Sequence, residues 1–274
     1  MALDDERFTS LLRDLEAEGN DLVATLEGLT DAEWALATPA EGWNIHDQVV
    51  HLAFFDDLAI LGFTRPDEFR LTIDGLRAGG PGWVDQVNRE RTLLPPAETL
   101  KWLTDGRAAL RQVFAEVGPG ARSQWFGPPM SGASAATARL METWAHGQDI
   151  YVALGLTHAV TDRVRHVCHL GVITRGFAFA LRALPAPRMD VRVELLAPSG
   201  ELWTWGPADA ADRVTGTAND FALVVTQRRH RDDTTLTATP GPAEQWLEIA
   251  QAFAGAATGG GRRPGQFTED EGSP

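Results

Sequence analysis

The sequence has a single cysteine, no apolar run of membrane-spanning length and no leader-like N-terminus. One cysteine, Cys168, excludes a disulfide within the chain, which favours a reducing compartment. The first ten residues carry neither the basic nor the apolar region of a secretory signal. No apolar segment approaches the roughly 20 residues that a membrane-spanning helix needs. These absences predict a cytoplasmic protein.

Basic residues are also scarce. Lys and Arg together number 24 against 38 Asp and Glu, which gives a formal net charge of -14. Binding to nucleic acid needs clustered Lys and Arg, and an acidic protein is repelled by anionic membrane surfaces. The sequence therefore predicts no nucleic-acid and no membrane partner, and the short basic run 228–231 is interpreted as a solvated surface.

What is present suits an ordinary globular chain. Its 274 residues are 43% hydrophobic and 23% charged, enough apolar material for a core without disulfides. Apolar residues at helical spacing predict long helices over 3–29, 45–63, 97–117 and 134–154, and a shorter helix over 83–91. Four such helices indicate a helical bundle. The Pro- and Gly-containing segment 64–82 is expected to be irregular, and we hypothesise that it forms a lid.

The pattern changes after about residue 185. Apolar and polar residues alternate over 191–196, a turn follows, and 201–205 is expected to be the returning strand of a hairpin. Further strands near 214 and over 235–238, with helices over 219–227 and 242–254, predict an α+β unit, joined to the first half by a helical stretch over 161–184. We therefore expect a four-helix bundle over 1–158, for which candidate metal ligands are given next, a C-terminal α+β domain over 159–255 and a disordered tail over 256–274.

Candidate metal ligands lie on two of the expected bundle helices. Glu142 and His146 are four residues apart, so they stand one helical turn apart on one face, and Asp149 continues that face. Such a pair can bind a metal ion, although alone it is more often a surface hydrogen bond. His51, among apolar residues, is either a core histidine or a third ligand from a facing helix. Two imidazoles and one carboxylate suit zinc with open positions, and nickel, iron(II) or cobalt also fit.

Two motifs give the sequence a family resemblance. The stretch Trp43–His51, with Asp47 midway, and the pattern Glu142-x-x-x-His146-x-x-Asp149 resemble the DinB-like superfamily. They are most similar to its actinobacterial mycothiol-dependent maleylpyruvate isomerase branch. The likeness covers nearly the whole chain, because 205–228 resembles that branch's C-terminal domain. It implies an α+β protein, with an N-terminal DinB-like four-helix bundle and a small C-terminal α+β domain.

The resemblance also assigns site residues by position. His51, Glu142 and His146 match the family's metal ligands, with zinc as the usual ion. Asp149 matches an acidic residue beside the site, which orients His146 or shuttles a proton.

A C-terminal arginine completes the implied site. Arg228 stands about where the family offers an arginine, whose planar fork would bind a carboxylate of the thiol or the substrate. The family commonly has Gly before this position, where this chain has Gln227. Arg229 takes the role if the register slips by one.

The implied activity is that of a divalent-metal-dependent enzyme with mycothiol, or a similar low-molecular-weight thiol, as cosubstrate. It would catalyse isomerisation or S-transfer on a small electrophilic substrate. The spacing of the motifs leaves two alternatives open, a metal-dependent hydrolase or lyase of the same fold and a non-catalytic metal- or ligand-binding protein. Neither the substrate nor the oligomeric state follows from the sequence.

Three further features have structural interpretations. His46 lies five residues before His51 and so points to another side of its helix, as a helix-start residue with a supporting role at most. Cys168, near His166, is interpreted as a small buried hydrophobe. The run Gly259–Gly261 precedes no Lys–Ser/Thr, so it is a linker and not a phosphate loop.

Overall fold

The computed structural model of the chain describes residues 4–257 and 262–266. Its contacts divide the chain into two compact units, residues 1–158 and 159–274. Among the described residues, no helix combines the length and the apolar character needed to cross a membrane.

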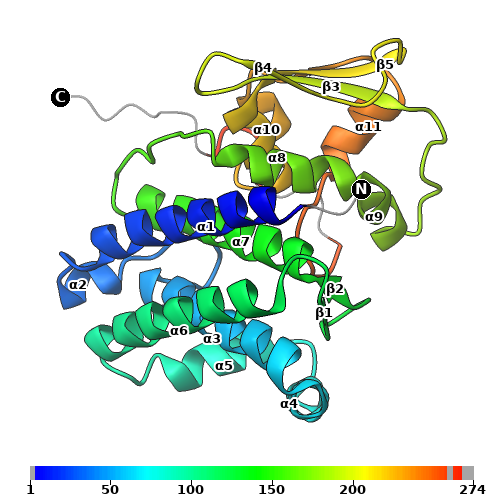
Figure 1. Cartoon of the computed structure of the whole chain (residues 1–274). Helices are drawn as coiled ribbons and strands as arrows, with labels where there is room; N and C mark the ends of the chain where they lie inside the picture. Colours follow the sequence, from blue (N-terminus) through cyan, green and yellow to red (C-terminus); the bar gives the residue numbers. More distant parts are fainter. Residues whose placement is uncertain (1–3, 258–261, 267–274) are drawn as a thin grey trace, which may run out of the picture. The chain divides into compact units, whose positions relative to one another are not determined.

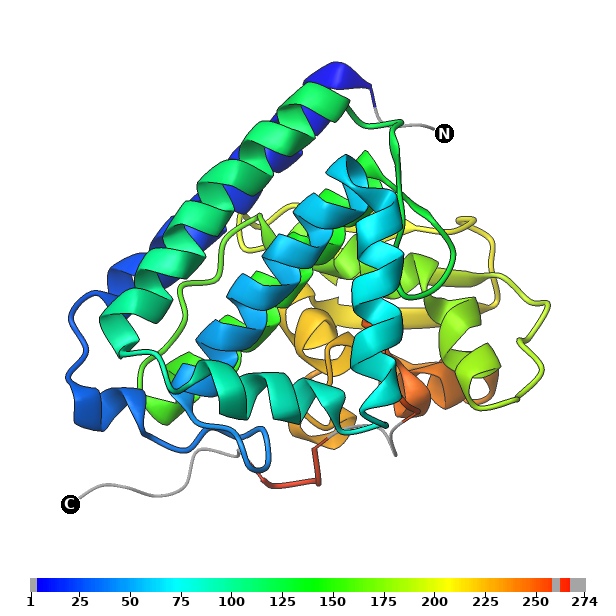
Figure 2. The ribbon, with the colours of Figure 1, turned by 90° about the horizontal axis from the view of Figure 1, so that it is seen from below.

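Four long helices form the first unit. They are α1 (Asp5–Leu26), α3 (Ile45–Thr64), α6 (Pro96–Val117) and α7 (Gly132–Ala153). Helix α3 packs against α6 and α7, and α1 packs against the same two helices, which closes a four-helix bundle (Figure 2). Side chains from all four helices meet in its core, among them Leu22, Val49, Leu103 and Ile150. The shorter elements are α2 (Asp31–Trp34), α4 (Pro66–Ala78), α5 (Trp83–Arg91) and a hairpin of β1 (Arg122–Ser123) and β2 (Met130–Ser131).

Capping residues set where the two site-bearing helices begin. Asn44 accepts a hydrogen bond from the backbone N–H of Asp47 at 2.9 Å, and Asp47 accepts one from the backbone N–H of Asn44 at 2.9 Å. This reciprocal capping box satisfies two donors that a helix N-terminus leaves free. Ser131 caps α7 by accepting from the backbone N–H of Ser134 at 3.1 Å. The caps fix the register in which α3 and α7 present their side chains.

The segment over 64–82 differs from the expected irregular lid, because most of it is helix α4. Pro66 stands at the start of α4, where its missing N–H costs nothing. Phe69 and Ile73, four residues apart, then bury one face of the helix against Leu58 of α3. The expectation of an irregular segment was wrong, because it gave the proline too much weight as a helix breaker. The lid stays a prediction.

A four-stranded sheet with helices on one face forms the second unit (Figure 1). Its order is β4-β3-β5-β6, with bounds β3 (Val191–Leu196), β4 (Leu202–Trp205), β5 (Asp212–Thr217) and β6 (Thr237–Ala238). Strand β3 runs antiparallel to β4 and parallel to β5, and β5 runs antiparallel to β6. Helices α10 (Ala218–Val225) and α11 (Pro242–Ile249) pack on the sheet, and α8 (Val164–Ile173) packs on α10. Helix α9 (Arg175–Leu181) and a 3-10 turn (Arg231–Asp233) complete the unit.

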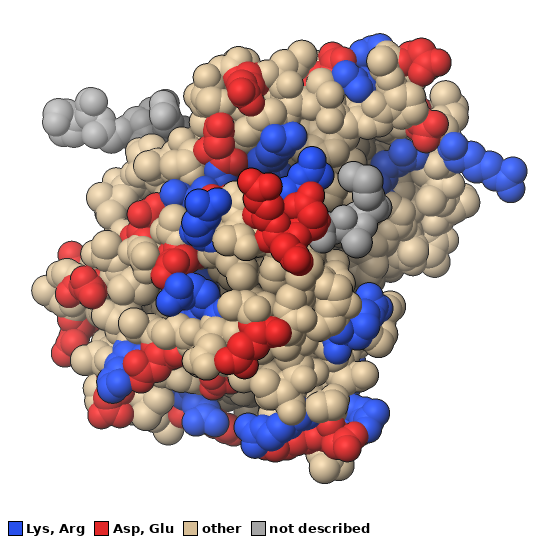
Figure 3. Space-filling view, viewed as in Figure 1, with Lys and Arg blue, Asp and Glu red and all other residues tan. Residues whose placement is uncertain are grey.

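The architecture confirms the expected fold class, a four-helix bundle followed by a small α+β unit. Part of the expected disordered tail is described, and there the backbone N–H of Gly265 donates to the carboxylate of Asp233 at 2.8 and 2.9 Å. The run Gly259–Gly261 and residues 267–274 lie outside the described residues. On the face drawn in Figure 3, described side chains of both charge signs lie interspersed.

Candidate metal centre

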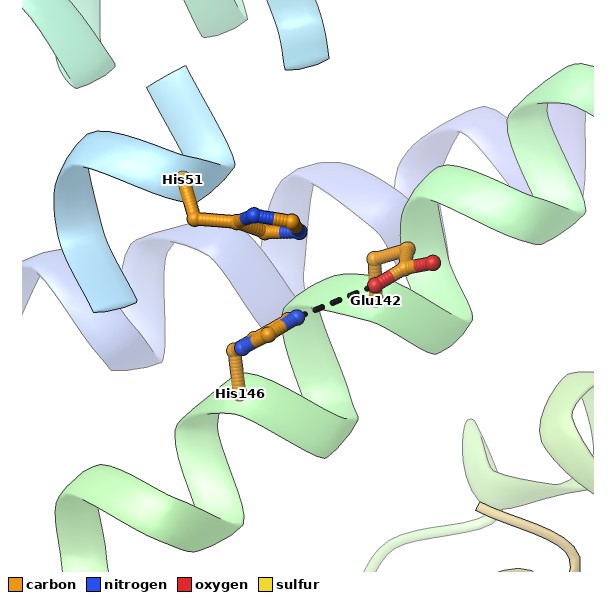
Figure 4. Close-up of side chains that lie close together, drawn as sticks. All are labelled: His51, Glu142 and His146. Carbon is orange, nitrogen blue, oxygen red and sulfur yellow. Dashed lines mark hydrogen bonds and ion pairs between the residues drawn. The ribbon is translucent and has the colours of Figure 1, made fainter. Parts of the chain in front are cut away.

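Two facing helices of the bundle bring three ligand-type side chains together. His51 comes from α3, and Glu142 and His146 come from α7, which packs against α3. One potential ligand atom from each of the three lies within 4.8 Å of the others. Figure 4 shows the two imidazole rings and the carboxylate converging on one point between the helices. We call these three residues the ligand cluster.

The carboxylate of the ligand cluster is ionised. Oε2 of Glu142 lies 3.1 Å from Nε2 of His146. Burial alone would raise the pKa of Glu142, but the interactions of its carboxylate with His146, His51 and Arg139 lower this pKa to about 2. Glu142 is therefore an anion throughout the neutral pH range, as a metal ligand must be.

Aromatic rings hold the two imidazoles in place. The His51 ring lies 4.4 Å from the Phe55 ring and 5.1 Å from the Trp43 ring, measured between centroids. The Trp43 ring also stacks on His146, with centroids 6.1 Å apart and planes 17° from parallel. The two histidine rings are themselves 4.5 Å apart. Packing on several sides limits the rotamers open to both rings.

The donor chemistry of the ligand cluster fits a divalent ion. Two imidazole nitrogens and one carboxylate oxygen are the ligand types of three-residue zinc sites, in which further positions stay open for water or substrate. The His146 and Glu142 side chains keep 10% and 22% of their surface exposed, so the cluster is not sealed. Its occupancy by metal stays a prediction.

Sequence reasoning missed a buried amide beside the cluster. Oε1 of Gln48 lies 2.5 Å from Nδ1 of His146, on the side of the ring away from Glu142. Gln48 is fully buried. Its position three residues before His51 was the available signal, because that spacing puts both side chains on one face of α3.

A buried ion network next to the cluster was also missed. The fully buried carboxylate of Asp56 accepts hydrogen bonds from Nε of Arg107 at 2.5 Å and from Nε of Arg139 at 2.7 Å. Arg107 also donates to Oγ1 of Thr143 at 2.7 Å. The network joins α3, α6 and α7, and the Arg139 charge is one of those that lower the pKa of Glu142. Asp56, one of two adjacent Asp residues in the otherwise apolar middle of α3, was its sequence signal.

The remaining predicted site residues stand as follows. Asp149 is buried on α7, three residues after His146, and is not part of the ligand cluster identified among the described residues. Arg228 and Arg229 belong to the second unit, so their role at the cluster stays a prediction. Gln227, just before them, has φ of 60°, and its amide donates to the backbone oxygen of Ala250 at 2.9 Å.

His46 and Cys168, for which the sequence indicates structural roles, are both buried outside the ligand cluster. His46 is buried on α3, with Nε2 at 2.7 Å from Oγ1 of Thr99, and is not a member of the ligand cluster. Cys168 is buried in α8, and burial raises the pKa of its thiol. A buried thiol with a raised pKa is inert, which confirms the interpretation of Cys168 as a small hydrophobe.

Known proteins resemble both units. The sequence model described as mycothiol maleylpyruvate isomerase N-terminal domain matches residues 15–151, and the model described as wyosine base formation matches residues 187–239. Two curated relatives from Mycobacterium tuberculosis are each 46% identical over 242 residues, which cover 88% of this chain and 94% of the relative. They are Uncharacterized protein Rv0036c of strain ATCC 25618 / H37Rv and Uncharacterized protein MT0041 of strain CDC 1551 / Oshkosh.

Two solved structures share the fold. They are crystal structures of the mycothiol-dependent maleylpyruvate isomerase and of a point mutant of that enzyme, with TM-scores of 0.54 and 0.55. Their sequences are 16% and 15% identical to this one, and each alignment covers 85% of this chain and 93% of the other. Identity at this level supports the shared fold alone. The match over residues 15–151, half of the chain, carries the assignment: this chain belongs to the family of the mycothiol maleylpyruvate isomerase N-terminal domain.

Proposed function

We propose that this chain is a divalent-metal-dependent enzyme that uses mycothiol, or a similar low-molecular-weight thiol. The enzyme isomerises a small electrophilic substrate or joins the thiol to it through sulfur (S-transfer). One observation carries the proposal. The ligand cluster lies inside the segment 15–151 that matches the mycothiol maleylpyruvate isomerase family. The cluster supplies the two imidazoles and the carboxylate that a three-residue metal site needs.

In this proposal His51, Glu142 and His146 hold a zinc ion, with nickel, iron(II) and cobalt as alternatives. A bound ion of this kind supplies a Lewis acid that favours the thiolate form of a thiol. Glu142 contributes a fixed negative charge, because its pKa of about 2 keeps it ionised. Asp149, one turn further along α7, helps to orient the His146 side chain.

The thiolate is the nucleophile of the proposed reaction. Its sulfur forms a bond to one carbon of a conjugated double bond, and the π electron pair moves onto the conjugated carbonyl oxygen. Rotation about the new single bond follows, and return of the electron pair expels the thiolate, so the thiol is recovered unchanged. In S-transfer the carbon–sulfur bond stays, and a leaving group departs or a proton is added.

Arg228 is the proposed carboxylate-binding residue. The left-handed φ of 60° at Gln227 supports this register, because the residue after a helix C-cap is where glycine is favoured. The family's glycine before the arginine thus corresponds to Gln227, which adopts the backbone conformation that glycine adopts readily. Arg228 rather than Arg229 is then the matching arginine.

The metal content of tag-free protein tests the ligand cluster. Plasma mass spectrometry of the wild type should find about one zinc-like ion per chain. His51→Ala and His146→Ala should each lose it, whereas the control His166→Ala, on α8, should keep it. Full metal retention in His51→Ala, or no metal in the wild type after reconstitution, would overturn the metal site and favour a binding protein without turnover.

Turnover assays test the thiol. Maleylpyruvate and other electrophilic acids are mixed with the metal-loaded protein and mycothiol, with glutathione as the control thiol. Loss of the substrate's cis double bond while free thiol stays constant indicates isomerisation, and stoichiometric loss of thiol indicates S-transfer. Metal-dependent consumption of substrate without any thiol would contradict the proposal and indicate a hydrolase or lyase.

A further inference from the structure

A chain of hydrogen bonds, partly buried where it begins and buried where it ends, leads to the imidazole of His146. The backbone oxygen of Trp43 accepts from the N–H of Thr38 at 2.8 Å and from the Thr38 hydroxyl at 2.9 Å. The Thr38 hydroxyl oxygen accepts from Nε2 of Gln48 at 2.8 Å. Oε1 of Gln48 lies 2.5 Å from Nδ1 of His146. We call this the relay, which runs Trp43–Thr38–Gln48–His146.

The backbone oxygen at the start of the relay sets the direction of every bond in it. A carbonyl oxygen can only accept, so the single proton of the Thr38 hydroxyl points to Trp43. The lone pairs of that hydroxyl then face Gln48, which must offer its NH₂ group there. Reversing the Gln48 amide would leave two oxygens competing for one hydroxyl proton.

The relay therefore presents an oxygen to His146. Oε1 of Gln48 carries no proton, so a hydrogen bond at 2.5 Å requires the proton to sit on Nδ1 of His146. A neutral imidazole has one N–H and one lone pair, so the lone pair is on Nε2. That atom faces Oε2 of Glu142 at 3.1 Å and belongs to the same cluster as His51.

We propose that Gln48 is a positioning residue, which holds His146 in the tautomer protonated at Nδ1 and so directs the Nε2 lone pair toward Glu142 and His51. The importance of that tautomer for metal binding rests on the proposed function above. Without the relay, the favoured neutral form of His146 would carry its proton on Nε2 and donate it to Glu142. In that tautomer Nε2 of His146 and Oε2 of Glu142 are hydrogen-bonded to each other, so neither atom is available as a metal ligand.

The loop that anchors the relay is itself held rigidly. Ala37 and Asn44 form an isolated antiparallel bridge, and Asn44 is the capping residue of α3. Nε1 of Trp43 donates to Oδ1 of Asp85 on α5 at 3.0 Å, while the Trp43 ring stacks on His146. The same loop therefore fixes the plane of the His146 ring and, through Gln48, the position of its proton.

The tautomer is measured directly in the metal-free protein. Long-range ¹⁵N–¹H spectra of histidine-labelled protein at alkaline pH distinguish Nδ1–H from Nε2–H, and His146→Ala identifies the His146 signals. The wild type should show Nδ1–H. Gln48→Leu should shift His146 toward Nε2–H, and Gln48→Glu, which still accepts a hydrogen bond, should retain Nδ1–H.

Zinc affinity is the second readout, measured by competition with a chromophoric chelator. Loss of a group that orients a metal-bound histidine weakens binding by about 10- to 100-fold, so we expect this for Gln48→Leu. Gln48→Glu should stay close to the wild type. This conservative variant separates the role of the acceptor from that of a buried side chain that only fills space, and circular dichroism checks the fold of both variants.

Three outcomes would overturn the inference. They are an Nε2–H tautomer in the wild type, an unchanged tautomer and affinity in Gln48→Leu, and a loss in Gln48→Glu as large as in Gln48→Leu. The first needs no Gln48 variant, so a misfolded Gln48→Leu does not block the test. A wild type that binds no zinc would overturn the proposed function, whereas the tautomer of its His146 would still decide the role of Gln48.

Discussion

The interiors of the two units differ in the kind of side chain that they bury. Among the described residues, all but one of the buried acidic, arginine and histidine side chains belong to the first unit. These are Glu18, His46, Asp56, Arg139, His146 and Asp149, against Asp212 alone in the second unit. Both units bury apolar side chains, which in the second unit lie between the sheet and the helices, among them Leu195, Phe221 and Trp246. Ionisable groups suited to chemistry are thus concentrated in the bundle.

The difference has an energetic reason. A buried charge costs several kcal/mol unless an opposite charge and hydrogen bonds compensate it. Asp56 has both, with two arginines on its two oxygens. We infer that the stability of the first unit depends on the pairing of its buried charges as well as on its apolar core, whereas that of the second depends mainly on the apolar area that it buries.

The largest loss of stability is expected for Asp56→Ala, which tests whether the first unit depends on its buried ion pairs. The substitution leaves Arg107 and Arg139 without their shared carboxylate inside the bundle. Removing one partner of a buried ion pair typically costs 3–5 kcal/mol, so we expect the free energy of unfolding of the first unit to fall by about 4 kcal/mol. Urea denaturation followed by circular dichroism measures the change.

The matched control for Asp56→Ala is Asp67→Ala. Asp67 also pairs with an arginine, Arg70, but both side chains are exposed. Exposed ion pairs contribute little, so this variant should stay within about 1 kcal/mol of the wild type. Equal losses in Asp56→Ala and Asp67→Ala would show that burial of the charge network is not what stabilises the bundle.

The corresponding change in the second unit is Leu195→Ala. Leu195 is fully buried in β3, and truncation of such a side chain costs about 3 kcal/mol through lost burial and the cavity that remains. Leu196, the next residue along the strand, is 52% exposed, so Leu196→Ala should change the free energy of unfolding by about 0.5 kcal/mol or less. Urea titrations of both variants measure this. A destabilised Leu196→Ala would contradict the alternation of buried and exposed side chains along β3.

The same contrast explains what the sequence could predict. The long helices and the hairpin of the second unit follow from local periodicity. So does the shared face of Glu142 and His146, because residues four apart on a helix share a face. The resemblance then matched His51 on a second helix with Glu142 and His146. Helix α4 was missed because Pro66 was counted as a breaker, although a proline is favoured at the first helical position.

The polar pairing inside the bundle could not be predicted from local pattern. Asp56 and Arg139 are 83 residues apart in the sequence, and Gln48 and His146 are 98 apart. Only the packing of α3 against α7 brings each pair together. Helical periodicity indicates which face of a helix is buried, but not which polar side chain on that face meets which partner.

The smallest effect is expected at His46. This buried ionisable side chain forms its hydrogen bond with a neutral hydroxyl rather than with a carboxylate. Its Nε2 lies 2.7 Å from the Thr99 hydroxyl and its ring meets the edge of Trp34. Burial lowers the pKa of His46, and the nearby Asp47 charge opposes this only in part. The unfolded chain therefore binds a proton at His46 more readily than the folded protein does.

The sign of the pH effect follows from that difference. As the pH falls through about 6.5, the ordinary pKa of histidine, the unfolded state gains a proton that the folded state resists, so the free energy of unfolding decreases. His46→Gln keeps a polar group toward Thr99 but cannot titrate. Urea denaturation at pH 8 and at pH 5.5 should show a larger loss for the wild type than for His46→Gln. An equal loss in both would mean that the bundle accommodates a charged His46 without cost.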